Sequence, residues 1–271
     1  MEIDLLIFLI PLLITGLISG LLAGLLGVGG GIIIIPVVFY ILNFYGFSKD
    51  IIMHVAIASS LGVIFITSLS SMYAHYKLKN IEVDVIKKWF TGIILGSIFG
   101  AFFASSMNGN VLVIIFGIIA STVAISMFLN IKIVLAKDVP HNFFLNNIIG
   151  LFIGYFSVLI GIGGGSFSVP TLIAFGKNIH RAVGTSASIG LLIAFPGFIT
   201  YAFRGWMIEE LPRYSIGYVN LPIVLAVASV SVLTAPLGAK LSNKANKKSL
   251  KKIFAIFLLL ICVSLVIDQF Y

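Results

Sequence analysis

Charged residues are scarce in this chain. Of its 271 residues only 10% are Asp, Glu, Lys or Arg, whereas 60% are hydrophobic, and the mean hydropathy is +1.18. A soluble domain of this length needs a far larger polar share to cover its surface. Apolar runs such as Leu5–Leu26 and Val111–Leu129 are also near or at the length needed to cross a bilayer core. The sequence therefore predicts an all-α polytopic membrane protein.

Residues for covalent, metal or nucleotide chemistry are also missing. The lone cysteine, Cys262, excludes an internal disulfide, and the chain has no Cys/His ligand cluster, no nucleophile paired with a base and no P-loop. We therefore expect no cofactor, no metal and no enzymatic activity. No Asp, Glu, Lys or Arg lies deep inside an apolar segment, although many proton-coupled carriers need an intramembrane carboxylate or histidine. His54 and His75 lie near the two ends of one segment, and we interpret them as interfacial or packed side chains.

The distribution of lysine predicts the topology. Lysines concentrate in two loops, Lys77–Lys88 and Lys240–Lys252, and short lysine-rich loops stay cytoplasmic. Ten crossings place both loops inside and both termini outside, whereas eight crossings place the loops on opposite faces. The acidic start of the chain, with Glu2 and Asp4, favours a retained first helix over a cleaved signal. We therefore predict a multi-pass protein of a prokaryotic inner or plasma membrane, with loops 107–110 and 204–213 outside.

One glycine-rich motif occurs twice. GVGGGIIIIP at Gly27–Pro36 returns half a chain later as GIGGGSFSVP at Gly161–Pro170, and other landmarks recur in the same order. This pattern predicts a duplication into membrane repeats 1–136 and 143–271 within one integral membrane domain. Each repeat has five apolar segments, and because five is odd the repeats must be inverted relative to each other. The expected segments are 5–28, 31–46, 51–75, 86–107, 111–135, 143–162, 165–176, 182–203, 214–240 and 251–270. Whether 31–46 and 165–176 cross the membrane fully is left open, so the number of spans is eight to ten.

The glycine motifs predict broken helices. Each glycine in a helix costs about 1 kcal/mol relative to alanine, and unwound backbone inside a membrane is tolerated only where protein or a wet cavity surrounds it. A helix that restarts after the glycines exposes free N–H groups and the positive end of its dipole, where an anion can bind. Glycines at four-residue spacing, as at Gly16/Gly20/Gly24 and Gly96/Gly100, instead indicate close helix packing.

The candidate substrate-binding residues are the motif glycines and the hydroxyl or amide side chains at matching places in the two halves. They are Gly27, Gly29, Gly30, Gly31, Gly161, Gly163, Gly164, Gly165, Ser166, Ser59, Ser60, Thr185, Ser186, Ser188 and Asn220. The hydroxyls could donate to an oxyanion or could form hydrogen bonds between helices, and both roles stay open. Ser166 and Ser168 follow the second motif where the first has isoleucine. We therefore expect the second motif to make more of the contacts that recognise the substrate.

Several stretches together resemble the sulfite exporter TauE/SafE family of membrane permeases. They are the two glycine–proline motifs, Thr185–Gly190, LPRYSIGYVN at Leu211–Asn220 and TAPLGAKLS at Thr234–Ser242. The resemblance covers nearly the whole chain and is most specific at Leu211–Asn220. It implies export or exchange of small sulfur-containing anions such as sulfite and organosulfonates.

The sequence thus predicts a secondary transporter in which a small anion binds between two glycine-initiated half-helices and the two halves rock. H⁺ or Na⁺ could be the coupling ion. A cation-coupled uptake permease or channel-like protein for another small organic anion is the alternative. A membrane enzyme would have to use His54, His75, Asp50 and His180, which are scattered. A scaffold that binds partners through 240–252 is the third rival.

Overall fold

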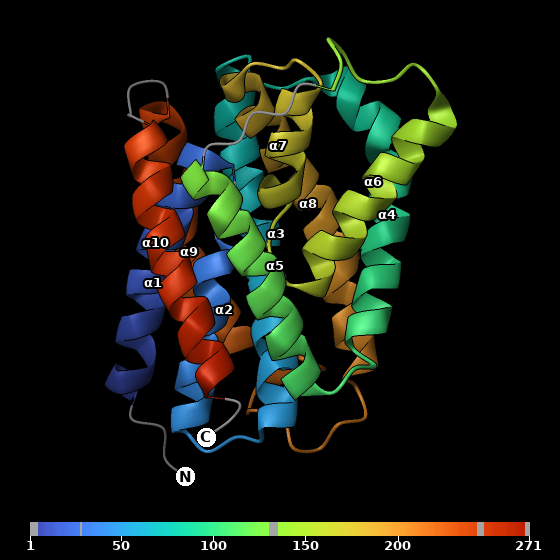
Figure 1. The fold of residues 1–271 in the computed structure, drawn as a ribbon. Coiled ribbons are helices and arrows are strands. Elements are labelled where there is room, and N and C mark those ends of the chain that lie inside the picture. The colour runs from blue at the N-terminus through green and yellow to red at the C-terminus, as the bar shows by residue number, and fades with distance from the viewer. Residues whose placement is uncertain (1–4, 28, 130–134, 243–246, 269–271) are drawn as a thin grey trace.

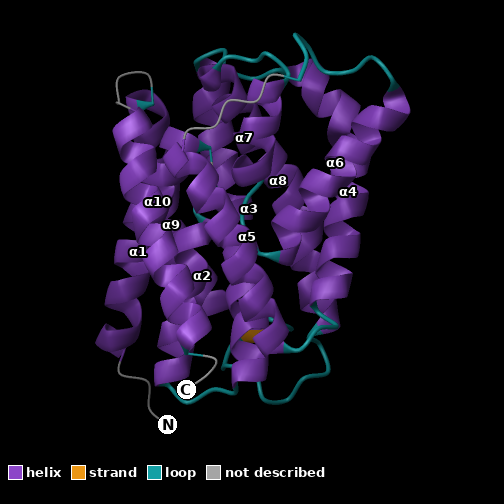
Figure 2. Cartoon of the chain, viewed as in Figure 1, coloured by secondary structure: helices purple, strands orange, loops and turns teal. Residues whose placement is uncertain are grey.

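The chain folds into a bundle of helices. A computed structural model describes residues 5–27, 29–129, 135–242 and 247–268. Within these ranges there are ten α-helices and one short antiparallel hairpin of two strands (Figures 1 and 2). The elements are α1 (Leu5–Leu26), α2 (Gly31–Phe44), α3 (Lys49–Lys77), α4 (Val83–Ala104), α5 (Gly109–Leu129), α6 (Phe143–Leu159), α7 (Gly165–Ala174), α8 (Ile179–Arg204), β1 (Ser215–Ile216), β2 (Val219–Asn220), α9 (Leu221–Leu241) and α10 (Lys247–Ile267).

The expected all-helical membrane fold is confirmed. Each of the ten predicted segments corresponds to one helix, and six helices (α1, α3, α4, α5, α8 and α9) are long and apolar enough to span a bilayer. The predicted segment 214–240 starts too early, because Asn220 caps the helix that begins at Leu221 and the residues before it form the hairpin. Parts of the predicted segments at 28, 130–134 and 269–270 lie outside the described residues.

Both glycine motifs interrupt a helix, as predicted. α1 ends at Leu26 and α2 begins at Gly31, and α6 ends at Leu159 and α7 begins at Gly165. Positive φ angles, which glycine adopts without a steric penalty, occur in both breaks: at Gly27, Gly29 and Gly30 in the first and at Gly161 in the second. At a rise of about 1.5 Å per residue, α2 is about 21 Å long and α7 about 15 Å. Both are shorter than a bilayer core of about 30 Å. Each helix therefore begins inside the bundle and reaches only one of its ends. α2 and α7 reach opposite ends (Figure 1).

Small residues bring two pairs of helices into backbone contact. A Cβ atom placed on Gly20 of α1 would lie 2.6 Å from the carbonyl oxygen of Ser231 in α9. One placed on Gly96 of α4 would lie 2.2 Å from the carbonyl oxygen of Leu151 in α6. Gly24 and Gly100 make the same kind of contact one turn later. These glycines therefore serve close packing, as their spacing predicts.

The helix pairs interleave the two sequence halves. α1 packs along α9 and α4 along α6, while α3 and α8 pack together at the centre and α5 packs on α10. In the predicted repeats, α1 corresponds to α6 and α4 corresponds to α9. The α1–α9 pair of one arrangement therefore corresponds to the α6–α4 pair. This pairing is the one expected of the repeats 1–136 and 143–271, whose inverted relation stays a prediction.

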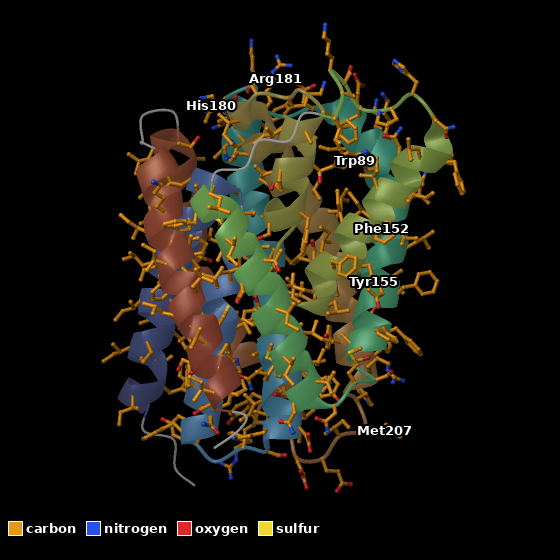
Figure 3. All side chains as sticks on the ribbon, viewed as in Figure 1. Trp89, Phe152, Tyr155, His180, Arg181 and Met207 are labelled. Atoms are coloured by element: carbon orange, nitrogen blue, oxygen red, sulfur yellow. The ribbon has the colours of Figure 1, made fainter. Side chains whose placement is uncertain are left out.

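The predicted grouping of loops agrees with the arrangement in space. The α3–α4 connection lies at one end of the bundle, where α9 also ends and α10 begins (Figure 1). The connections α4–α5 and α8–α9 lie at the other end, with the start of α1 and the end of α10. Figure 3 marks the two ends with Arg181 and Met207. Which end faces the cytoplasm stays a prediction.

Candidate functional site

The two glycine breaks touch each other. A Cβ atom placed on Gly29 would lie 2.7 Å from the Cα of Gly163, and one placed on Gly31 would lie within 2.3 Å of the carbonyl oxygen of Gly161. Such distances leave no room for any side chain at Gly29 or Gly31. The structure thus brings the two motifs together, backbone against backbone.

Two serines hold these breaks reciprocally. The Ser60 hydroxyl of α3 donates to the Gly161 carbonyl at 3.0 Å, and the Ser186 hydroxyl of α8 donates to the Gly27 carbonyl at 2.6 Å. Each serine therefore fixes the glycine break of the opposite half. Since a hydroxyl has a single proton to donate, neither serine can also donate to a ligand in this arrangement.

Three further predicted side chains secure the starts of helices. Ser59 accepts a hydrogen bond from the backbone N–H of Asn220 at 3.0 Å, and Thr185 accepts one from the N–H of Glu82 at 2.9 Å. Asn220 and Glu82 are the N-cap residues of α9 and α4. The Asn220 side chain itself accepts from the N–H of Ile223 at 3.2 Å. For these residues the geometry favours the role in helix–helix hydrogen bonding that the sequence left open.

The remaining predicted hydroxyls are buried without a partner. Ser166 and Ser168 of α7 and Ser188 of α8 are each less than a tenth exposed, and among the described residues none has a hydrogen-bond partner for its Oγ. An unsatisfied buried polar group costs about 1–3 kcal/mol. Such hydroxyls are expected where a ligand or water completes the site, and all three belong to the second half.

Gly190 faces a thinly packed space at the start of α7. A Cβ atom placed on Gly190 would have only two heavy atoms within 4 Å outside its own helix backbone: Ser68 Oγ at 3.0 Å and the backbone nitrogen of Gly164 at 3.8 Å. Gly164 is the N-cap of α7, so this space lies at the positive end of that helix. Sequence reasoning missed Ser68 and Gly190 as site residues. Gly190 could have been suspected as a glycine inside the long helix that also supplies Ser186, whereas Ser68 had no signal.

The start of α2 meets a hydroxyl that is already paired and apolar side chains. A Cβ atom placed on Gly31 would lie 2.8 Å from the Ser60 Oγ, which donates to the Gly161 carbonyl. The Cδ1 of Ile64 would lie 3.0 Å from a Cβ on Gly31, and Ile32 and Ile34 in the first turn of α2 are fully buried. The Gly30 carbonyl accepts hydrogen bonds from the N–H groups of Ile33 and Ile34. Among the described residues, Ser166 and Ser168 follow the second motif with unpartnered hydroxyls, whereas the first motif has isoleucines at these places. That the second motif recognises more of the substrate stays a prediction.

Charged side chains form ion pairs at the end of the bundle that α7 reaches. Arg181 donates to the Glu82 carboxylate at 2.5 Å, and Lys177 donates to Asp138 at 2.9 Å. The hydrogen bond from Lys177 holds the pKa of the Asp138 carboxyl below its ordinary value. These ion pairs join the connections α3–α4, α5–α6 and α7–α8, which places them over the end that α7 reaches.

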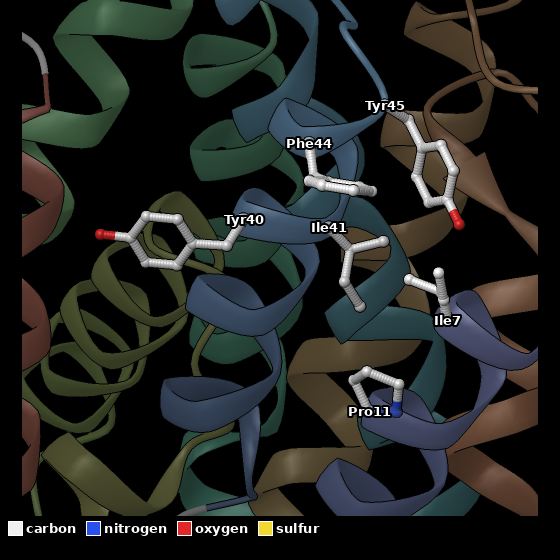
Figure 4. A pocket seen from close by; sticks show the side chains of 6 residues that line it. All are labelled: Ile7, Pro11, Tyr40, Ile41, Phe44 and Tyr45. Carbon is white, nitrogen blue, oxygen red and sulfur yellow. The ribbon is translucent and has the colours of Figure 1, made fainter.

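Two other candidate sites can be set aside. Within the described part of the chain no group of His, Cys, Asp and Glu could hold a metal ion. A pocket of about 220 Å³ lies between α1 and the end of α2 (Figure 4). Its lining is apolar apart from tyrosine hydroxyls, and it contains none of the glycine-motif residues: Ile7, Pro11, Tyr40, Ile41, Phe44 and Tyr45.

Comparison with known proteins identifies the family. The model of the family described as "Sulfite exporter TauE/SafE" matches residues 12–265. The chain belongs to the TauE/SafE family. The resemblance seen in the sequence is thereby confirmed, and the chain is a transporter, not an enzyme.

Relatives of this TauE/SafE chain carry names of the same kind. A "Probable membrane transporter protein" of Haemophilus influenzae is 34% identical over 242 residues, which are 88% of this chain and 90% of the relative. A protein described in the same words from Methanocaldococcus jannaschii is 31% identical over 232 residues, 83% of each chain. A third, from Bacillus subtilis, is 29% identical over 268 residues, 91% of this chain and 93% of the relative. No solved structure matches the chain.

The histidines of the rejected enzyme hypothesis are far apart. His54 lies in the second turn of α3, whereas His180 lies at the start of α8, at the opposite end of the bundle (Figure 3). His54 and His75 are both buried. Of the two interpretations offered for them, a packed side chain therefore fits better than an interfacial one. The Nε2 of His75 lies 3.2 Å from the Gly24 carbonyl oxygen.

Proposed function

We propose that this transporter carries a small sulfur-containing anion, sulfite or an organosulfonate, and binds the anionic group at the start of α7. The observation that carries the proposal is the sparse packing beside Gly190, where a Cβ atom would meet only Ser68 Oγ and the backbone nitrogen of Gly164 within 4 Å outside its own helix backbone. An anion there would meet the positive end of α7 and at least one hydroxyl donor without a charged side chain.

The expected interaction energies suit reversible binding. A helix N-terminus stabilises an anion by about 0.3–1 kcal/mol, and by up to about 2 kcal/mol where it is partly buried. Each hydrogen bond to a charged group adds about 1.5–3 kcal/mol. Two or three such contacts correspond to a dissociation constant in the millimolar to micromolar range before other costs. A buried cationic side chain would bind the anion more tightly and release it more slowly.

The unpartnered hydroxyls extend this site along α7 and α8. Ser166 lies in the first turn of α7, and Ser168 of α7 and Ser188 of α8 are further buried serine hydroxyls without partners in the two packed helices. The side chains of Ile189 and Ile193 flank Gly164, at 2.8 Å and 2.9 Å from a Cβ placed there. The site thus offers polar contacts beside an apolar wall, which accommodates an oxyanion with or without a short hydrocarbon group.

Flux into proteoliposomes tests the proposal. Purified protein is reconstituted, and uptake of labelled sulfite and of labelled methanesulfonate is followed, with the unlabelled anion inside to support exchange. We expect saturable flux of at least one of the two anions. Repeating the measurement with potassium in place of sodium separates the alternative, since a sodium-coupled permease would lose its flux. Absence of saturable flux for both anions would sink the proposal.

A further inference from the structure

His54 is a buried imidazole with only one nitrogen engaged. Its side chain is 4% exposed, and its Nδ1 lies 2.8 Å from the carbonyl oxygen of Asp50, one turn earlier in α3. A carbonyl oxygen can only accept a hydrogen bond, so Nδ1 carries a proton. In the neutral side chain Nε2 therefore has no proton and carries a lone pair that can only accept a hydrogen bond. It is buried, and no described residue gives it a hydrogen bond.

Two backbone carbonyl groups lie near the His54 ring and would accept a hydrogen bond from Nε2 once it is protonated. The backbone carbonyls of Ala104 and Met107, at and just after the end of α4, lie within interaction range of the His54 ring. The end of a helix carries partial negative charge. Carbonyl oxygens repel the Nε2 lone pair but would accept a hydrogen bond from a protonated Nε2. These carbonyls favour the charged form of the ring, whereas its burial favours the neutral form.

An aromatic side chain of the β1–β2 hairpin covers the ring. The Tyr218 ring stacks on His54 with 4.8 Å between centroids and 21° between planes. Tyr218 lies in the tight turn between β1 and β2, and its ring in turn packs edge-on against Tyr201 of α8. A positively charged imidazole binds an aromatic face more strongly than a neutral one. Protonation would therefore fasten the hairpin to α3 and to the end of α4.

The hairpin is linked to the glycine breaks through α3. Asn220, two residues after Tyr218, is held by the Ser59 hydroxyl, and the adjacent Ser60 holds the Gly161 carbonyl. His54, Ser59 and Ser60 lie on the same helix within two turns. A change at His54 thus acts on the residues that position α9 and the second break.

Few other ionisable groups surround His54. Asp50 contributes from α3 itself, Tyr218 from the hairpin, and Tyr201 and Arg204 from α8. The Arg204 guanidinium donates to Ser105 at 3.1 Å and to Ser106 at 2.8 Å, which ties α8 to the α4–α5 connection at this end. From α4 itself, the backbone carbonyls are the groups that interact with the ring.

We propose that His54 is a proton-binding site that controls the opening of this end of the transporter. The inference rests on the proposed function for its effect on transport, but not for proton binding itself. A proton from water binds Nε2, donates to the α4 carbonyls and keeps the hairpin closed. Loss of that proton to water frees the hairpin. Opening therefore requires the neutral ring, and the proton returns to the side from which it came.

The test measures exchange flux of labelled sulfite in proteoliposomes as the pH is varied equally on both sides. Below the titration of His54 we expect wild-type flux to fall by about tenfold per pH unit, because the neutral fraction falls by that factor. His54→Gln should flatten this dependence. His141→Gln, the same substitution in an exposed loop, should retain it. An unchanged slope in His54→Gln overturns the inference. So does accumulation of sulfite driven by a pH gradient alone in the wild type, because that result requires proton transport and not gating.

A second measurement is independent of transport. Side-chain NMR of nitrogen-labelled histidine in nanodiscs, assigned by difference with His54→Gln, should show His54 with its proton on Nδ1 when neutral. It should also show His54 taking up a proton as the pH is lowered through the range of the flux measurements. Tyr218→Leu should weaken proton binding and lower the titration midpoint, whereas Tyr218→Phe should preserve it. A His54 that stays neutral across this range overturns the proton site. If the site titrates but the wild type carries neither sulfite nor methanesulfonate, the proposed function fails and the proton site stands.

Discussion

Replacing Gly190 with alanine should separate substrate binding from folding. The added methyl group would enter the space between Ser68 Oγ and the Gly164 nitrogen, 3.0 Å from the hydroxyl, which can rotate away. Gly190 lies inside α8, where alanine is about 1 kcal/mol more favourable than glycine. We therefore expect Gly190→Ala to fold at least as stably as the wild type.

Anion binding should weaken in the same variant. The methyl group displaces the anion from its contacts with Ser68 and Gly164, and losing one hydrogen bond to a charged group costs about 1.5–3 kcal/mol. At about 1.4 kcal/mol per factor of ten, the half-saturating concentration should rise by about 10- to 150-fold. Labelled-anion flux gives the affinity, and thermal unfolding in detergent gives the stability.

Gly62→Ala is the matched control for this variant. Gly62 lies inside α3, and its added Cβ would also meet one side chain at 3.0 Å, that of Val224, away from the start of α7. Its half-saturating concentration should stay unchanged. Unaltered affinity in Gly190→Ala would refute the placement of the site. Parallel loss of affinity and folding would show that Gly190 serves packing.

Three further substitutions probe the site and its framework. Gly96→Val should prevent folding, since even a Cβ would lie 2.2 Å from the Leu151 carbonyl oxygen; loss of monodisperse protein on size-exclusion chromatography checks this. Ser186→Ala should lower the free energy of unfolding by about 1–3 kcal/mol because the Gly27 carbonyl loses its donor, and a stability equal to wild type would contradict the role of that bond. Ser166→Ala should leave stability unchanged and weaken anion affinity by several-fold, as flux measurements at graded substrate concentration would show, because its hydroxyl has no protein partner to lose.

The fold was largely predictable because the membrane limits the choices. Long apolar runs form helices, and the glycine runs predicted both breaks, with helix ends placed to within three residues. The exception was the start of α9, where Asn220 and Pro222 end an apolar stretch that hydropathy alone reads as continuous. Hydropathy does not detect a cap, because the cap depends on the Asn220 side chain accepting a hydrogen bond from the N–H of Ile223.

The candidate site was only partly predictable. Hydroxyl type and position predicted which side chains lie near the breaks, but Ser186 and Ser166 differ only in whether a carbonyl lies within reach. That difference arises from packing between helices distant in sequence. Gly190 and Ser68 acquire their place from the approach of α3, α7 and α8, for which a single sequence offers no spacing to measure.

The glycine contacts of α1 with α9 and of α4 with α6 determine which parts of the molecule can move. Backbones that meet without intervening side chains cannot slide past each other without steric overlap. Each pair must therefore travel as one rigid body, and each body contains helices from both sequence halves. Rocking of the first half against the second would have to tear both pairs apart. We therefore expect alternating exposure of the proposed site to hinge at the two glycine breaks, with moving parts that do not coincide with the predicted repeats.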